Sequence, residues 1–245
     1  MDLSPDALQY HIHCRKGDVG RYVLLPGSPE RAATISKYFD RAEKIAQHRE
    51  YSVYSGYVGG VKVSVCSTGI GGPSTAIAVE ELAKIGADTF IRVGSSGIMQ
   101  SHMKKGDLIV GTSAIRDEGT SQQYMPLSFP ATANYQVVNG LIKACMNLRV
   151  NYHVGIVHSK DSFYGEVEPE RSPLQDAIQK RWQAWVAGGA LCSEMESATL
   201  FVVASVLGKR AGALMMAGGT DQSVENLCQV AVESLRVLAA QDQHP

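Results

Sequence analysis

The stretch STGIGGPSTAIAVEELAKIGADTFIRVGSSG, residues 67–97, holds the pattern that decides the fold. An alternating apolar run over 61–67 leads into a glycine-rich turn, and Pro73-Ser74 then opens a segment of helical period that ends at Gly86. A second apolar run over 89–93 follows. Strand, helix and strand in this order form the unit from which sheets with parallel strands are built. We therefore predict an α/β fold.

The rest of the chain repeats this alternation. We predict strands over 21–25, 51–58, 61–67, 89–93, 107–115, 154–158 and 211–216. We predict helices from Ser28-Pro29-Glu30 onward and over 73–86, 134–148, 174–186, 196–207 and 224–240. Gly59-Gly60 joins two strands as a tight hairpin, so the sheet is predicted to be mixed. The prediction is one α/β domain over 1–245, with a central mixed sheet flanked by helices.

Composition excludes several classes of function. The chain has 245 residues, with 23 Lys and Arg against 24 Asp and Glu, so no excess of positive charge is available for nucleic acid or an anionic membrane surface. No window of about 18 apolar residues is present and the first residues lack the pattern of a signal peptide, so we expect a cytoplasmic protein. Five scattered cysteines are expected to be reduced core thiols: Cys14, Cys66, Cys145, Cys192 and Cys228.

Two segments place an arginine beside a Gly or Ser turn near the end of a predicted strand. In PGSPER, Gly27 allows close backbone approach and Arg31 could bind an anion at a helix start, although a capped helix with a solvated arginine explains the same residues. In IRVGSSG, Arg92 ends an apolar strand and Ser95 follows in the predicted loop. A buried guanidinium needs an anionic partner, which could be a ligand or a structural salt bridge.

The segment SEMES, residues 193–197, places two carboxylates ahead of an apolar helix. Carboxylates are stabilised at a helix N-terminus, and that alone explains them. The alternative is that Glu194 and Glu196 accept hydrogen bonds from the vicinal hydroxyls of a sugar, with Met195 as an apolar wall. Arg49, in HRE, is open to the same two interpretations, a charged strand edge or an anion ligand.

Taken together, the ordered set PGSPER, HRE, STGIGGPS, IRVGSSG, DSFYGEVEPER and SEMES resembles the nucleoside phosphorylase superfamily and, within it, the uridine phosphorylases. The resemblance spans about residues 10–210. It implies a mixed central sheet flanked by helices. It also implies cleavage of a nucleoside by inorganic phosphate to give the base and ribose 1-phosphate, with no dedicated nucleophile in the protein.

The resemblance also implies roles for individual residues. The phosphate site would comprise Gly27, Arg31, Arg92 and Ser95, with Arg49 from a neighbouring copy. The ribose site would comprise Glu194, Met195 and Glu196, with His11 from the neighbour. The base site would comprise Phe163, Glu166 and Arg171, and the catalytic residues would be Arg92 and Arg171. A monovalent cation would bind at the dimer interface near Glu50, Ile70 and Ser74, in a dimer-based oligomer that is usually a hexamer. No organic cofactor is expected.

The chain departs from the uridine phosphorylase pattern at Glu166, where a glutamine is expected. Uracil presents acceptor, donor and acceptor along one edge, and an ionised carboxylate can serve only the donor. Three explanations follow: Glu166 is protonated, it pairs with Arg171, or the substrate differs. Guanine and hypoxanthine offer N–H donors to a carboxylate, so purine nucleoside phosphorolysis is the alternative function.

A second departure follows the run 211–221, where the family has a flap before its last helix and this chain passes almost directly to Val224. The flap is predicted to be deleted, so a catalytically weak nucleoside-binding paralogue is a further alternative. Three histidines have no motif around them and are assigned to packing: His102, His153 and His158.

Overall fold

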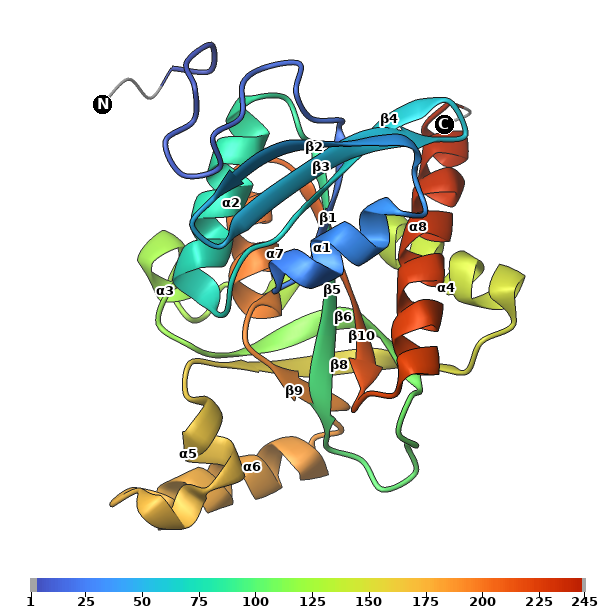
Figure 1. The fold of residues 1–245 in the computed structure, drawn as a ribbon. Coiled ribbons are helices and arrows are strands. Elements are labelled where there is room, and N and C mark those ends of the chain that lie inside the picture. Colours follow the sequence, from blue (N-terminus) through green and yellow to red (C-terminus); the bar gives the residue numbers. More distant parts are fainter. Residues whose placement is uncertain (1–3, 244–245) are drawn as a thin grey trace.

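The computed structural model describes residues 4–243, in which strands and helices alternate as predicted (Figure 1). The strands are β1 (Tyr22–Leu25), β2 (Asp40–His48), β3 (Tyr51–Val58), β4 (Val61–Cys66), β5 (Thr89–Ile98), β6 (Leu108–Asp117), β7 (Ala131–Thr132), β8 (Tyr152–Lys160), β9 (Cys192–Glu194) and β10 (Arg210–Ala217). The helices are α1 (Pro29–Ser36), α2 (Gly72–Lys84), α3 (Ser121–Tyr124), α4 (Tyr135–Leu148), α5 (Phe163–Val167), α6 (Gln175–Ala187), α7 (Ser197–Val206) and α8 (Asp221–Gln243), with a 3₁₀ turn η1 (Pro169–Arg171).

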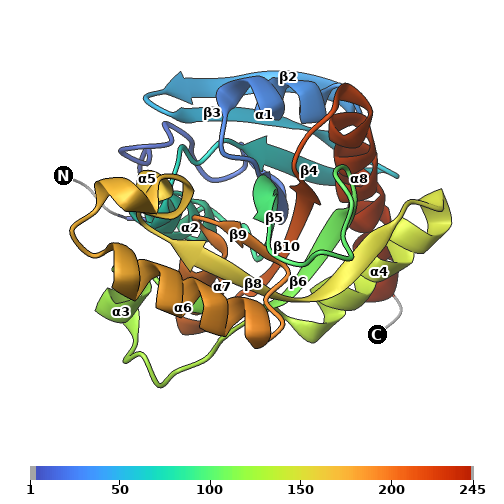
Figure 2. The ribbon, with the colours of Figure 1, turned by 90° about the horizontal axis from the view of Figure 1, so that it is seen from below.

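The sheet is mixed, and β5 is its centre. This strand pairs in parallel with β1 and β10 and antiparallel with β9. From β10 the pairing continues through β6, β8 and β9 and returns to β5, which closes a ring of five strands (Figure 2). On its other side β5 carries β1, β4, β3 and β2. The predicted hairpin is present, with positive φ angles of 57° and 79° at Gly59 and Gly60.

Two hydrophobic cores lie on the two sides of β5. Phe90 belongs to the core under α2 and α7, whereas its neighbour Ile91 belongs to the core under α1, α4 and α8. Successive side chains of a strand point to opposite faces, so one apolar run serves both cores. Burying a side chain of this size contributes roughly 1.5–3 kcal/mol. The five cysteines are free and buried, as predicted, and burial raises the pKa of Cys145 to about 12.

The predicted end of β5 is wrong, because the strand continues through the Gly/Ser segment to Ile98. Pairing with β10 extends to Ser96, and pairing with β9 holds Gly97 opposite Ser193. Arg92 is therefore within the strand and not at its end. Gly94 makes this possible, since a Cβ there would lie 2.8 Å from the Arg92 guanidinium carbon.

Other differences concern short or polar elements. Strand β2 was not predicted, because DRAEKIAQH is largely exposed and has no apolar alternation. Strand β10 and helix α8 are joined by residues 218–220 alone, in agreement with the predicted loss of a longer connection. Within residues 4–243, no helix has the length and apolarity needed to cross a membrane.

Candidate active site

Two arginines meet where the carboxyl end of β1 lies beside the middle of β5. The register of these parallel strands places Leu25 beside Arg92, so the turn that follows β1 lies against the Arg92 side chain. Arg92 Nη1 lies 3.6 Å from the Cβ position of Gly27. Ser28 caps helix α1, and Arg31 in its first turn donates from Nη2 to Ser95 Oγ at 3.0 Å. The structure therefore brings together four residues predicted for phosphate: Gly27, Arg31, Arg92 and Ser95.

The two glutamates of SEMES hold Arg92 from its other side. Arg92 Nη2 lies 2.5 Å from Glu196 Oε2, and Arg92 Nε lies 3.5 Å from Glu194 Oε2. Glu196 Oε1 accepts from the Gly71 backbone N–H at 2.7 Å. Glu194 accepts from the hydroxyl of Ser159 and from the backbone N–H of Ser197 at the start of α7. Glu194 therefore fulfils the structural role predicted for a carboxylate at a helix start, and it also holds Arg92.

These residues, here called the Arg92 group, are Gly27, Arg31, Arg92, Ser95, Glu194 and Glu196, and on the side facing Gly27 they leave a guanidinium N–H donor unused. Arg92 is 6% exposed, and its Nη1 is buried without a hydrogen-bond acceptor in the described residues. Arg31 has no carboxylate partner between residues 4 and 243, and burial, followed by the nearby Arg92, lowers its pKa. An unmade hydrogen bond of a buried donor costs about 1–3 kcal/mol, and more when the group is charged. An anion with several acceptor oxygens would satisfy both guanidinium groups.

Arg49 and His11 lie outside this group in the same chain. Arg49 sits in the two-residue turn between β2 and β3, with φ of 53°, and its guanidinium carbon lies 5.9 Å from the ring centre of Tyr10. His11 Nδ1 lies 2.7 Å from the carboxylate of Glu81 on α2. Neither side chain contacts Arg31 or Arg92 in the described part of the chain.

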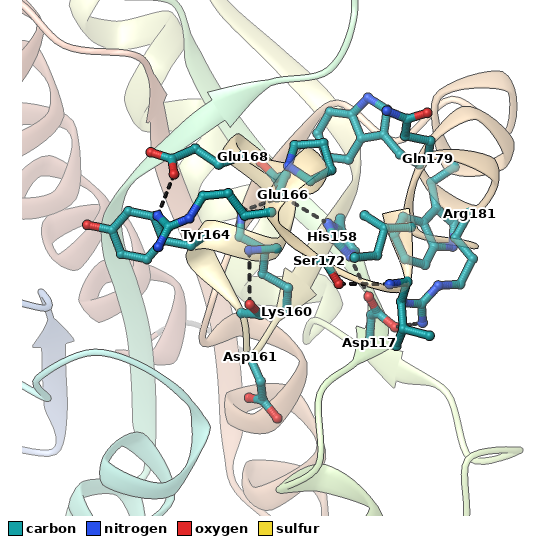
Figure 3. A pocket seen from close by; sticks show the side chains of 18 of the residues that line it. Asp117, His158, Lys160, Asp161, Tyr164, Glu166, Glu168, Ser172, Gln179 and Arg181 are labelled. Carbon is teal, nitrogen blue, oxygen red and sulfur yellow. Dashed lines mark hydrogen bonds and ion pairs between the residues drawn. The ribbon is translucent and has the colours of Figure 1, made fainter. Parts of the chain in front are cut away.

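Glu166, on the short helix α5, lies in a second polar group. Its Oε2 forms an ion pair with Lys160 at the end of β8, accepts from Ser193 Oγ at 2.5 Å, and lies 3.8 Å from His158 Nδ1. Lys160, Glu166 and His158 line a pocket of about 760 Å³, and Figure 3 shows their side chains close together in its wall. The pocket is lined mainly by β8, α5, η1 and α6 and does not include the Arg92 group.

Arg171 does not pair with Glu166, so that explanation of the unusual glutamate is wrong. Arg171 Nη1 lies 2.5 Å from Glu168 Oε2, and the guanidinium carbon lies 5.7 Å from the ring centre of Tyr164. The Arg171 side chain is 68% exposed, whereas that of Lys160 is 8% exposed. A buried lysine six residues before Glu166 is the nearer cation, and it neutralises the carboxylate.

Comparison with known proteins decides the family. The model of the phosphorylase superfamily matches residues 21–241. The chain belongs to the phosphorylase superfamily. It is 46% identical to the uridine phosphorylase of Thermococcus kodakarensis over 98% of this chain and 90% of that protein. It is 43% identical to the uridine phosphorylase of Treponema pallidum, over 96% and 95%. It is 38% identical to the guanosine phosphorylase of Halorubrum lacusprofundi, over 87% and 84%.

In this phosphorylase superfamily member the three residues predicted for a cation also lie together. Ser74 Oγ lies 3.4 Å from the backbone oxygen of Ile70. The Cβ position of Gly69 lies 2.9 Å from Glu50 Cγ and 3.4 Å from Ser74 Oγ. Ile70 is 78% exposed, so this corner of the phosphorylase is at the surface of the single chain.

Sequence reasoning missed Lys160, Ser159 and Ser193 as members of the polar groups. It also assigned His158 to packing, whereas His158 Nδ1 lies 3.0 Å from Ser193 Oγ. A lysine at the carboxyl end of an apolar strand was the available signal, since such a residue seldom becomes buried without a partner. The serines carried no comparable signal, because a hydroxyl fits both buried and exposed positions.

Proposed function

We propose that this protein is a nucleoside phosphorylase that cleaves uridine with inorganic phosphate to give uracil and ribose 1-phosphate. The observation that carries the proposal is the buried Arg92, whose unpartnered Nη1 faces Gly27 while Arg31 and Ser95 lie beside it. A phosphate dianion supplies acceptor oxygens for Arg92 Nη1 and a negatively charged partner for Arg31. The uridine phosphorylases of T. kodakarensis and T. pallidum support uridine as the nucleoside.

In the proposed reaction, a phosphate oxygen held by Arg92 and Arg31 forms a bond to C1′ of the ribose as the bond from C1′ to the base breaks. The transition state resembles an oxocarbenium ion, so the adjacent dianion stabilises the positive charge on the sugar. The electron pair of the broken bond leaves with the base, which takes a proton from water. The two arginines orient and partly neutralise the phosphate, which lets it approach the carboxylates of the site.

Glu196 and Met195 are proposed to bind the ribose. Glu196 Oε1 accepts one hydrogen bond, from Gly71, and a carboxylate oxygen can accept about two, so it can also accept from a ribose hydroxyl. Both oxygens of Glu194 already accept from Ser197 and its neighbours, so its part in ribose binding is to hold Arg92 and the start of α7. Phe163, Glu166 and Arg171 are proposed to lie at the base.

We further propose a dimer-based oligomer, with three dimers forming a hexamer, in which each site is completed by the neighbouring copy. In one chain, Arg49 and His11 lie outside the Arg92 group. In the oligomer, Arg49 would bind phosphate and His11 would bind ribose in the site of the neighbouring copy. A monovalent cation would bind at the interface, where Ser74 and Ile70 offer oxygen atoms and Glu50 offers negative charge. Sedimentation at micromolar concentration tests the assembly, and a fully active monomer would contradict it.

Guanosine phosphorolysis is the second candidate. The carboxylate of Glu166 favours it, because guanine presents N–H donors, and the H. lacusprofundi relative is named a guanosine phosphorylase. Incubating the protein with uridine, inosine and guanosine, each with and without phosphate, distinguishes the candidates. Uridine cleavage that requires phosphate is the expected result. Cleavage without phosphate would contradict phosphorolysis, and uracil binding with no turnover of any nucleoside would favour the weak paralogue.

A further inference from the structure

Lys160 and Glu166 form a pair whose two members come from adjoining elements. Strand β8 ends at Lys160, and helix α5 begins at Phe163, so the chain reverses and places Glu166 over the lysine. Lys160 Nζ contacts Glu166 Oε2 and donates to Ser193 Oγ at 2.8 Å. The side chains are 8% and 15% exposed. The carboxylate is therefore neutralised inside the protein and does not present a free negative charge to a ligand.

The pair nevertheless keeps one acceptor and one donor unused. In the described residues every hydrogen bond and ion pair of Glu166 is made by Oε2, which leaves Oε1 available. Two of the three hydrogens of Lys160 Nζ are used, by Glu166 and Ser193, and the nitrogen lies 5.7 Å from the ring centre of Phe163.

The free oxygen of Glu166 lies near the residues that are proposed to bind phosphate. Glu166 Oε1 lies 3.6 Å from the Cβ position of Gly97, which comes two residues after Ser95 on β5. Two residues along a strand span roughly 7 Å and return to the same face. A nucleoside with phosphate at Ser95 would therefore extend its base toward Gly97 and Glu166.

We propose that Lys160 and Glu166 read the base as one unit, in which Glu166 Oε1 accepts from a ring N–H and Lys160 Nζ donates to the adjacent carbonyl oxygen. This inference rests on the proposed function and names the class of base that the site accepts. An acceptor beside a donor, with no net charge, is what a neutral amide offers, so the pair serves uracil without the expected glutamine. The repulsion between a carboxylate and a uracil carbonyl is removed because the lysine faces that carbonyl.

The same geometry sets the specificity. An N–H next to a carbonyl is present in uracil, at N3 and its neighbouring oxygen, and in hypoxanthine and guanine, at N1 and O6. Cytosine and adenine present a bare ring nitrogen next to an amino group, which reverses donor and acceptor. A site built for one arrangement rejects the other strongly, because its buried polar groups are left unpaired. The accepted class is therefore nucleosides of oxo bases, and cytidine and adenosine are excluded.

The experiment measures kcat/KM for uridine and cytidine at saturating phosphate in the wild type, Lys160→Met, Glu166→Gln and the double variant. We expect the wild type to prefer uridine by at least about 100-fold. Lys160→Met should lower kcat/KM for uridine roughly 30- to 100-fold, since the carboxylate then faces a carbonyl unneutralised. Glu166→Gln should lower it roughly tenfold, because the buried lysine loses its partner. The double variant should recover to within several-fold of the wild type, since the amide alone then serves both groups.

The controls separate this inference from folding and from the proposed function. Arg236→Met removes one end of an exposed ion pair with Glu233 on α8 and should change nothing. Equal thermal midpoints of the wild type and the variants exclude misfolding. Lys160→Arg keeps the positive charge and should retain the preference for uridine over cytidine. The inference would be overturned if the losses in kcat/KM of Lys160→Met and Glu166→Gln multiplied in the double variant. It would also be overturned if Glu166→Gln alone raised kcat/KM for uridine. If the wild type cleaves no nucleoside, the proposed function fails, and calorimetry of uracil against cytosine in the wild type and Lys160→Met then decides the role of the pair.

Discussion

The two polar groups of the site both bury a glutamate against a cation, yet they leave different atoms free. Ser193 and Glu194 are consecutive on β9, and because side chains alternate along a strand, each joins a different group. Around Glu194 the spare atom is a guanidinium N–H of Arg92, whereas around Ser193 the spare atoms are Glu166 Oε1 and a hydrogen of Lys160. The first group holds two arginines and two glutamates and offers unused guanidinium N–H donors to an anion. The second is neutral and offers a hydrogen-bonding pattern.

This difference shows what a buried ion pair can reveal about a ligand. The pairs themselves contribute little net stability, because desolvating the charges offsets most of their attraction. The atoms that the pairs leave without partners carry the information. Arginine suits the first group, since its fork contacts two glutamates and still presents a third face, and lysine suits the second as a compact point charge.

The largest effect is expected for Arg92→Met. Loss of the guanidinium removes the main phosphate contact and leaves Glu194 and Glu196 buried without their cation, so kcat/KM should fall by at least about 1,000-fold, equivalent to ~4 kcal/mol. Steady-state kinetics with uridine and phosphate measure it. Arg92→Lys should recover only part of the activity, because an ammonium cannot contact both glutamates and a phosphate. A change of less than tenfold in Arg92→Met would remove Arg92 from the site.

Arg31→Met should have a smaller effect that is confined to phosphate. Arg31 is half-buried, and within residues 4–243 its side chain bonds only the neutral hydroxyl of Ser95, so its loss should leave folding intact and raise KM for phosphate roughly 10- to 100-fold. The matched control is Arg236→Met, which removes an exposed arginine from α8. An unchanged KM for phosphate combined with an increased KM for uridine would place the anion elsewhere.

A third prediction concerns the pH dependence of folding stability that Glu196 causes in the Arg92 group. Burial raises the pKa of Glu196, and Arg92 offsets this only in part. The folded state therefore holds the proton more tightly, so this carboxyl favours folding below its unfolded pKa of about 4.3, and that contribution is lost as pH rises through the folded pKa. The Glu196→Gln variant has no ionisable group at position 196 and serves as the reference. The urea midpoint of the wild type, relative to that of the variant at one protein concentration, should fall as pH rises above about 4.3, the unfolded pKa. A constant difference would contradict the raised pKa.

The smallest effect is expected for Arg171→Met, roughly a threefold loss in kcat/KM for uridine. The arginine is exposed and pairs with Glu168, and exposed pairs contribute about 0–1 kcal/mol. Comparison with Lys160→Met is informative, because both changes remove one positive charge from the same pocket. A larger loss for Arg171→Met than for Lys160→Met would reverse the assignment of the base-facing cation.

The sequence predicted the residues around the phosphate more completely than the residues around the base. Gly27 and Arg31 follow the end of β1 in one short motif, and Arg92 and Ser95 lie in a second motif on the adjacent parallel strand β5, so strand pairing brings the two motifs together. The partner of Glu166 was not predictable in the same way. Local spacing did not show that α5 would turn back over β8, and Arg171 is one residue nearer to Glu166 in the sequence than Lys160 is. Strand β2 was missed because an exposed edge strand has no apolar alternation, and β5 was predicted too short because glycines usually end strands.

The ring of strands described above determines which part of the sheet could recruit another polypeptide. Strands β5, β10, β6, β8 and β9 pair in a ring, whereas β2 ends the strand order on the other side of β5 and, in residues 4–243, pairs with β3 alone, so one edge of β2 is open along its length. Its first half, with Asp40, Arg41, Glu43 and Lys44, is exposed and charged, and its register shifts twice against β3. Charges and bulges on an edge strand hinder the addition of a further strand, so the protein is protected against edge-to-edge aggregation at β2.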